Sequence, residues 1–288
     1  MGQREHGVAS GDGLRPAPHL PHCGPVAAGR AVVHHIVVDQ AEGVAFQIGG
    51  TTSAQLQVRF APSWLSWLPW VWGDYWVVDL DDAYELNPAN HFIRSMFHRA
   101  FPGNTNLDFH PDLHADDNDR HTVDEDLKEI GSKFFAIHMR NWHWPLKNIE
   151  IDTWVEIIAG VFGERTDYKI VTVGGATDLS LEHPLIFDAR ARYTPQQLKY
   201  LLDHAACFVG IDSGPFQIAG ASNVPIVGLL THISPEHIMP QRKMDYMWRA
   251  TAIQASVPCV GCNVRQQLPI RQIVCEHGDY RCTKTWDT

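Results

Sequence analysis

The sequence predicts an α/β protein built on parallel sheets. Two observations favour this class: from residue 133 onward short apolar runs alternate with longer amphipathic stretches, and one strand–turn–helix–strand unit is unusually clear. That unit covers residues 207–230, where two buried apolar runs flank a turn and a helix of small residues. Strands that alternate with helices are typical of βαβ units, which are joined by right-handed crossovers.

The first half of the chain is less regular. We expect strands at residues 31–39, 44–48 and 56–60, and a helix at residues 88–101. Residues 104–129 are polar, acidic and rich in histidine, which indicates an inter-domain connection that ends in a short helix. We therefore divide the chain into an N-terminal lobe, residues 1–125, and a C-terminal lobe, residues 130–288, which ends in a cysteine-rich tail.

The second half has clearer boundaries. We expect strands at residues 134–139 and 169–173, and helices at 152–162 and 194–206, with a further apolar run near residues 184–188. The last of these helices has the best start signals, since Thr194 is a good N-cap and Pro195 suits a first helical turn. Its leucines recur on one face, which predicts that this face is buried.

Composition restricts the function. The chain has 288 residues, is 44% hydrophobic and carries a formal net charge of −10. A general polyanion binder needs massed Lys and Arg, so this charge argues against one. The sequence contains no apolar stretch long enough for a membrane span, and its first residues lack a signal-peptide core. We expect a cytoplasmic protein whose cysteines are reduced or bound to metal.

The turn after the strand at 207–211 indicates an anion-binding site. Ser213 is a good N-cap, Gly214 allows a ligand to approach the backbone, and Pro215 needs no amide partner. A strand that runs into a helix start directs backbone N–H groups and a positive dipole end toward the edge of the sheet. Such a joint suits a phosphate group.

An ordered set of motifs over residues 134–282 resembles glycosyltransferase family 9, the heptosyltransferase-like enzymes. The set comprises His138-Met-Arg-Asn-Trp-His-Trp-Pro-Leu-Lys147, Ile170-Val-Thr-Val-Gly-Gly175, Asp212-Ser-Gly-Pro215, Val224-Pro-Ile-Val-Gly-Leu229 and Thr231-His-Ile-Ser-Pro235. The resemblance implies a GT-B-like fold of two Rossmann-like lobes, here with an abbreviated N-terminal lobe. It also implies that the C-terminal lobe binds a nucleotide-activated sugar.

The resemblance assigns roles by position. Donor-side residues would be Lys147, Gly174, Gly175, Asp212, Ser213, Gly214 and Gln217. Arg140 is added to them as a further cation that could stabilise the leaving diphosphate. Gln217 departs from the family, which usually has a histidine there. The family's catalytic aspartate follows a glycine in an N-terminal loop, and this assigns the role to Asp12. Asp39, at the end of an expected strand, is the next candidate. Asp74 and Asp79 follow it, and both belong to the tryptophan-rich stretch at residues 61–82.

The predicted function is hexosyl or heptosyl transfer from a nucleotide-sugar donor to a saccharide or other hydroxyl acceptor. The resemblance implies an inverting, metal-independent reaction that needs no cofactor. One alternative is a glycosyltransferase that acts on a hydroxylated nucleic-acid base, which the acidic charge disfavours. Others are an epimerase or hydrolase of nucleotide sugars and a non-catalytic nucleotide-sugar-binding protein.

The tail contains four clustered thiols, Cys259, Cys262, Cys275 and Cys282. The first two have the spacing that opens many all-cysteine zinc sites. The sequence leaves two readings open: a structural zinc ion held by four thiolates, or free or disulfide-bonded thiols that pin the C-terminus. Four thiolates would leave no open coordination position, so such a zinc ion would be structural.

Overall fold

The computed structural model describes most of the chain from residue 83 onward. The described residues are 83–84, 86, 90–100, 110–140, 145–163, 167–242, 249–268 and 272–286, with the backbone of strands β1 (Val33–Val37), β2 (Ala45–Phe46) and β3 (Leu56–Gln57). The three strands form a small sheet in which β1 pairs antiparallel with β2 and parallel with β3. The predicted general bases Asp12 and Asp39, and the tryptophan-rich stretch, lie outside the described residues.

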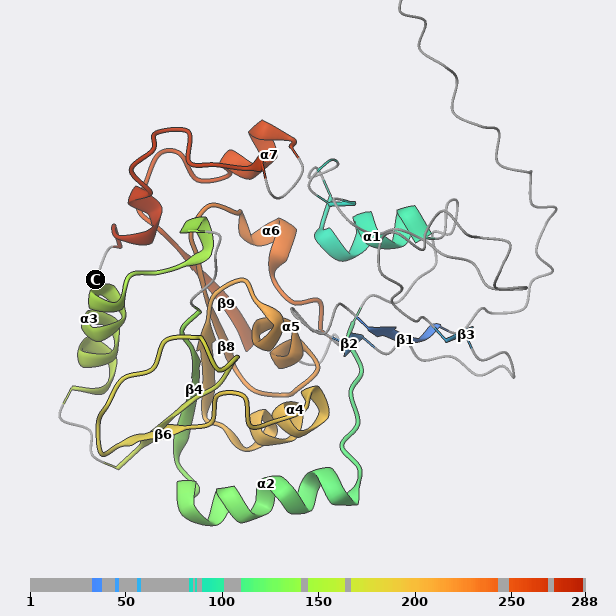
Figure 1. Cartoon of the computed structure of the whole chain (residues 1–288), viewed down its shortest axis with the longest axis vertical. Helices are drawn as coiled ribbons and strands as arrows, with labels where there is room; N and C mark the ends of the chain where they lie inside the picture. Colours follow the sequence, from blue (N-terminus) through green and yellow to red (C-terminus); the bar gives the residue numbers. More distant parts are fainter. Residues whose placement is uncertain are drawn as a thin grey trace, which may run out of the picture.

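A six-stranded, wholly parallel sheet forms the centre of the described structure (Figure 1). Its order is β6-β5-β4-β7-β8-β9, with bounds β4 Phe134–His138, β5 Lys169–Thr172, β6 Ile186–Asp188, β7 Cys207–Gly210, β8 Ile226–Leu230 and β9 Ala250–Gln254. The predicted α/β class with a parallel, Rossmann-like sheet is therefore confirmed.

Helices cover both faces of the sheet. The larger core lies on one face, against α2 (Asp117–Ile130), α4 (Pro195–His204) and α5 (Gly214–Gly220). The other face packs on α3 (Ile151–Phe162) through the fully buried Trp154. In β4, Phe134 and Ala136 belong to the first core and Ile137 to the second, as the alternation of side chains along a strand requires.

Local signals explain where the two central helices begin. Thr194 caps α4 by accepting a hydrogen bond from the N–H of Gln197, whose side chain accepts one from the N–H of Thr194. Ser213 caps α5 in the same way, with its hydroxyl accepting from the N–H of Phe216 at 3.3 Å. Both helix starts agree with the sequence prediction.

Three elements differ from expectation or extend it. The expected connection contains α2, a helix of 14 residues rather than a short one, which begins at a capping box formed by Asp116 and Asp119. The strand β9, which pairs with β8, was not predicted. The predicted helix near residue 88 is α1 (Phe92–Ala100), and the preceding His91 contacts the carbonyl of Met239 at 2.8 Å. Residues 91–100 therefore contact the C-terminal part of the fold.

Two short helices and two 3-10 turns complete the described structure: α6 (Pro235–Ile238), α7 (Cys262–Gln266), η2 (Pro145–Lys147) and η5 (Arg281–Thr283). Within the described ranges no helix combines the length and the apolar character that crossing a membrane requires.

Candidate functional site

The predicted donor-side residues follow the ends of β4, β5 and β7. Parallel strands place all their carboxyl ends at one edge, so loops that follow different strands become neighbours there. Lys147 comes from η2, after β4, and Asp212 follows β7. Their side chains form an ion pair, with 2.6 Å between Lys147 Nζ and Asp212 Oδ2. The structure thus joins two residues that the sequence assigned separately to the donor side.

Both members of this pair are shielded from water. Only 17% of the Lys147 side chain and 11% of the Asp212 side chain are exposed. Burial would raise the pKa of Asp212, but the charge and hydrogen bond of Lys147, with the charge of Arg140, hold that pKa below its ordinary value. Arg140 also donates a long hydrogen bond, 3.4 Å, to the Asp212 carbonyl. The edge therefore carries two cations around one ionised carboxylate.

The turn after Asp212 is well packed. Ser213 is buried, and its hydroxyl accepts the N–H of Phe216 while its carbonyl accepts the N–H of Gln217. The side chain of Gln217 is buried as well, and its amide donates to the carbonyl of Ile238 at 2.9 Å. Gln217 therefore links α5 to α6, and its side-chain oxygen Oε1 accepts no hydrogen bond from the residues that the structure describes.

A pair formed by the buried His138 and the partly buried Asp178 joins the end of β4 to the loop after β5. Nε2 of His138 lies 3.0 Å from Oδ2 of Asp178, and the same oxygen accepts the N–H of Gly175 at 2.6 Å. Gly174 has φ +131°, and a Cβ there would lie 2.4 Å from that oxygen. The space beside Gly174 is thus filled by the Asp178 carboxylate and the His138 ring.

At the end of β8, two side chains meet the turn that carries Lys147. The hydroxyl of Thr231 donates to the carbonyl of Leu146 at 2.5 Å, and Nδ1 of His232 lies 3.2 Å from the same oxygen. Both residues are buried. The carbonyl next to Lys147 is therefore held by a strand that is distant in sequence.

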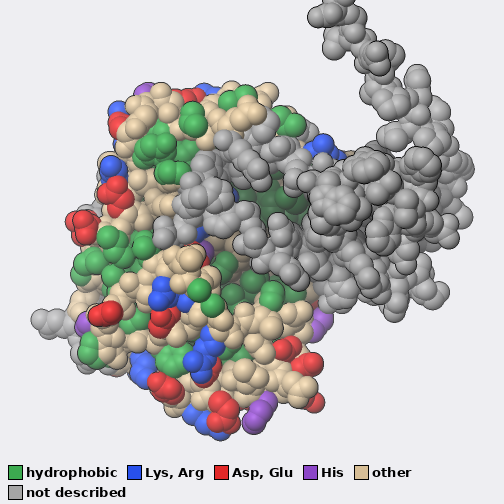
Figure 2. All heavy atoms as spheres, viewed as in Figure 1, with side chains coloured by type: hydrophobic (Ala, Val, Ile, Leu, Met, Phe, Trp, Pro, Cys, Tyr) green, Lys and Arg blue, Asp and Glu red, His purple; other side chains and the backbone are tan. Residues whose placement is uncertain are grey.

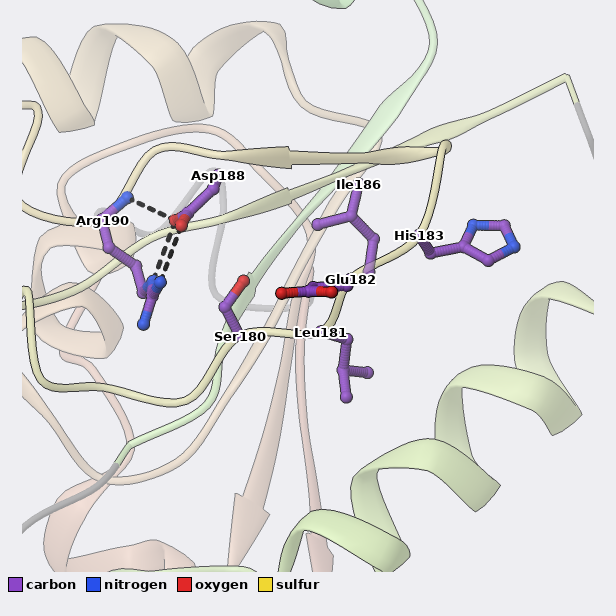
Figure 3. Close-up of a pocket in the computed structure, with 7 residues that line it drawn as sticks. All are labelled: Ser180, Leu181, Glu182, His183, Ile186, Asp188 and Arg190. Carbon is purple, nitrogen blue, oxygen red and sulfur yellow. Dashed lines mark hydrogen bonds and ion pairs between the residues drawn. The ribbon is translucent and has the colours of Figure 1, made fainter.

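A hollow of about 360 Å³ lies along the edge strand β6, near α3 (Figure 3). Its lining is mostly polar and comprises Ser180, Leu181, Glu182, His183, Ile186, Asp188 and Arg190. Arg190 donates three hydrogen bonds to the Asp188 carboxylate, two from its guanidinium and one from its backbone N–H, and these help to lower the pKa of that carboxyl to about 2. The guanidinium also donates to the carbonyl of Asp178. Through Arg190 the hollow is connected to the loop of the His–Asp pair.

The cysteine-rich tail, residues 259–286, lies beyond β9. Its four cysteines form no disulfide, and in the described parts of the chain no three or more His, Cys, Asp or Glu side chains are arranged to hold a metal ion. Cys275 and Cys282 belong to one small cluster of buried and partly buried side chains. Burial, with a smaller contribution from the charge of Glu276, raises the pKa of Cys262 to about 11, and burial with contributions from the other cysteines raises that of Cys282 to about 12. Tyr280 donates its backbone N–H to the sulfur of Cys275 at 3.4 Å.

Comparison with protein families identifies the relatives of this chain. Residues 111–268, more than half of the sequence, match the model of glycosyltransferase family 9 (heptosyltransferase). The chain belongs to glycosyltransferase family 9. The matched residues include the whole carboxyl edge described above, from Arg140 to His232. No curated protein matches the sequence.

Solved structures of family 9 proteins have similar folds. A family 9 glycosyltransferase from Veillonella parvula DSM 2008 is 18% identical, with a TM-score of 0.46 over 62% of this chain and 51% of that one. The E. coli ADP-heptose LPS heptosyltransferase II is 17% identical, with a TM-score of 0.42 over 57% and 52%. TibC, an iron-containing dodecameric glycosyltransferase from enterotoxigenic E. coli H10407, is 19% identical, with a TM-score of 0.42 over 62% and 42%. This family 9 chain spans about half the length of these structures.

Sequence reasoning placed part of this site and missed the rest. It assigned Lys147, Arg140 and Asp212, which the structure brings together. His138, Thr231 and His232 stand within the family motifs, but the sequence assigned no role to them. All three stand at or just after the end of a buried strand, and a polar residue in that position of a parallel sheet is the signal that points to them.

This protein is expected to lose stability as the pH falls from 6.5 to 4. Burial and the charge of Lys147 lower the pKa of His232 from 6.5 to about 4, and burial also lowers the pKa of His138. In this window the unfolded chain binds protons that the folded chain does not bind, so acid favours unfolding. His232 alone contributes about 3 kcal/mol to this change.

Urea denaturation at intervals between pH 7.5 and 4 measures this dependence. His232→Gln should reduce the slope of unfolding free energy against pH, whereas the same change at His114, whose side chain is 71% exposed, should not. If the unfolding free energy of the wild-type protein does not change with pH, or if His232→Gln has the same slope as the wild type, the lowered pKa of His232 is contradicted.

Proposed function

We propose that this chain transfers a hexosyl or heptosyl group from a nucleotide-sugar donor to a hydroxyl acceptor. The observation that supports this best is the shielded Lys147–Asp212 pair at the start of α5, within the part of the chain that defines its family. In this proposal the donor's diphosphate binds at Lys147 and Arg140, beside Ser213 and Gly214. Gly174 and Gly175 belong to the loop on the nucleoside side.

The residues at this edge suit a metal-independent departure of the nucleoside diphosphate. As the bond between sugar and phosphate breaks, negative charge develops on the leaving diphosphate, and fixed cations in a poorly hydrated site stabilise it. Lys147 can supply this charge, and Asp212 keeps its ammonium in place at 2.6 Å. Arg140 provides a second cation nearby.

The acceptor hydroxyl must lose its proton as the new bond forms, and a carboxylate near the acceptor performs this step in a single, inverting displacement. We propose Asp12 for this role, with Asp39 as the second candidate, on the sequence resemblance alone. The reaction moves one proton from the acceptor to this carboxylate and one glycosyl group from phosphate to the acceptor oxygen.

A thermal-shift titration tests the donor site. ADP, UDP, GDP, CDP and their sugar conjugates are added in turn, because a ligand that binds only the folded protein raises its melting temperature. We expect one nucleotide to raise it, with ADP tested first because the E. coli relative is an ADP-heptose enzyme. Ser213→Trp, which blocks the turn, should abolish the shift. A wild-type protein that responds to none of these ligands would contradict the proposal.

A nucleic-acid acceptor is not favoured. The net charge is −10, and on the face shown in Figure 2 basic and acidic side chains are interspersed over the described residues instead of forming a basic stripe. We therefore keep a saccharide or another small hydroxyl compound as the acceptor.

We also propose that the four cysteines of the tail bind one structural metal ion, with zinc as the first candidate. The donor set fits, because clustered thiolates prefer zinc or iron, and the cytoplasmic location predicted from the sequence would keep the thiols reduced. The relative TibC is described as iron-containing. Binding would draw the thiols together and replace their protons, which are otherwise retained at neutral pH because burial raises the pKa of Cys262 and Cys282.

Elemental analysis of the purified protein tests this proposal. We expect about one zinc per chain, with a chelator or Cys275→Ser lowering stability by about 3 kcal/mol or more. Cys207→Ser is the matched control, since Cys207 is a partly buried thiol in β7 that lies outside the tail. If the protein contains iron instead of zinc, the four-cysteine site is supported and its metal is iron. A metal-free protein that is indifferent to chelators would overturn the site.

A further inference from the structure

The backbone turn that carries Lys147 is tied to the end of β8. Lys147 is a long side chain, and holding its ammonium at one point requires that its own backbone be fixed. The adjacent carbonyl, that of Leu146, receives the Thr231 hydroxyl at 2.5 Å and approaches Nδ1 of His232 at 3.2 Å. A carbonyl oxygen only accepts, so His232 carries its proton on Nδ1 when it makes this contact.

Burial makes these contacts effective. Thr231 and His232 are 4% and 2% exposed, so water does not compete for the carbonyl. The low pKa of His232, about 4, leaves the ring neutral at physiological pH. A neutral ring can stand near the Lys147 ammonium without the repulsion that an imidazolium would cause.

The tail supports the same turn from another direction. The Leu146 side chain is buried in a small apolar cluster with Ala255, Ile273 and Cys282. Just beyond the turn, Glu150 donates its backbone N–H to the carbonyl of Thr283 at 3.2 Å. The residue before Lys147 is thus held at its side chain by the tail and at its carbonyl by β8.

We infer that Thr231 and His232 are positioning residues, which hold the turn of Lys147 so that its ammonium meets both Asp212 and the donor's diphosphate. This inference rests on the proposed role of Lys147 in binding the donor. It adds that the residues following β8 act on the donor through Lys147 and not by touching the donor themselves. Neither the sequence motif nor the family assignment gives them this role.

Calorimetric titration with inorganic pyrophosphate and with ADP tests the inference on the full chain. Thr231→Val removes the hydroxyl donor and should weaken pyrophosphate binding about five- to tenfold. Thr231→Ser retains the hydroxyl and should bind like the wild type. Ser222→Ala is the matched control, because Ser222 is an equally buried, hydrogen-bonded hydroxyl that lies before the start of β8 rather than after its end.

The decisive comparison uses a Lys147→Met background. If Thr231 acts through Lys147, then adding Thr231→Val to Lys147→Met should cause no further loss of binding. Equal losses in both backgrounds, or no loss from Thr231→Val in the wild type, would overturn the inference while leaving the donor site intact. If Lys147→Met itself binds normally, or the wild type binds neither probe, the proposed function fails, and the inference fails with it. His232→Phe carries the same expectations, in case Thr231→Val does not fold.

Discussion

Replacing Lys147 by methionine is expected to weaken the binding of a nucleoside diphosphate by about tenfold to hundredfold. A hydrogen bond between charged groups contributes about 1.5–3 kcal/mol, and the loss falls on the diphosphate, where the lysine supplies a positive charge. Binding of the uncharged nucleoside should hardly change. Calorimetric titration of wild type and variant with ADP and adenosine measures the difference.

The same substitution is expected to destabilise the fold by about 3 kcal/mol, because it leaves Asp212 buried without its partner. The double variant Lys147→Met/Asp212→Asn removes both charges and should recover most of this stability without recovering the affinity for the diphosphate. Urea denaturation separates the two effects. If the double variant regains binding, the lysine acts only on the fold and not on the donor.

Local signals in the sequence were sufficient for much of the C-terminal fold. Thr194 and Ser213 set the starts of α4 and α5 with their own side chains, and the apolar runs at β4, β7 and β8 become buried strands. The edge at which Asp212 stands follows from the parallel order of the strands. The helix starts and the apolar runs depend on residues that are neighbours in sequence.

Features that depend on distant partners were not predictable in this way. The buried residues of helix α2 are Val123, Asp126 and Ile130. Because one of them is an acid, the sequence of this segment does not show the regular spacing of apolar residues that predicts a buried helix face. Asp126 tolerates burial because Arg192 and Tyr193 donate to its carboxylate, at separations of 66 and 67 residues. Strand β9, Ala-Thr-Ala-Ile-Gln, has a single large apolar side chain, so only its pairing with β8 makes it a strand.

The site shows the same division. The sequence placed Lys147 and Asp212 on the donor side, but their ion pair joins two loops that only the tertiary structure brings together. The pair of His138 and Asp178 likewise joins the end of β4 to the loop after β5. The two glycines between them were predicted to give a nucleotide room, and that role stays a prediction.

Among substitutions that add a single methyl group at this edge of the sheet, Gly174→Ala is expected to destabilise the fold most. Gly174 has φ +131°, which a residue with a side chain rarely adopts, and the new Cβ would lie 2.4 Å from Asp178 Oδ2 and 2.6 Å from Cδ2 of His138. The buried His138 ring and the partly buried Asp178 carboxylate are engaged with each other, which limits the movement of both. Backbone strain and overpacking together predict a loss of about 3–5 kcal/mol in the free energy of unfolding.

The adjacent Gly175 provides the control, because an added Cβ there would make ordinary contact, at 3.5 Å, with the same carboxylate oxygen. Gly175→Ala should change stability by less than about 0.5 kcal/mol. Urea denaturation of both variants, with a nucleotide titration of each, distinguishes two roles for this loop. If Gly174→Ala is as stable as Gly175→Ala, the His138–Asp178 pair does not confine the loop as the structure indicates. If Gly175→Ala folds normally but loses nucleotide affinity, then the space at Gly175 serves the donor, while that at Gly174 serves the His–Asp pair.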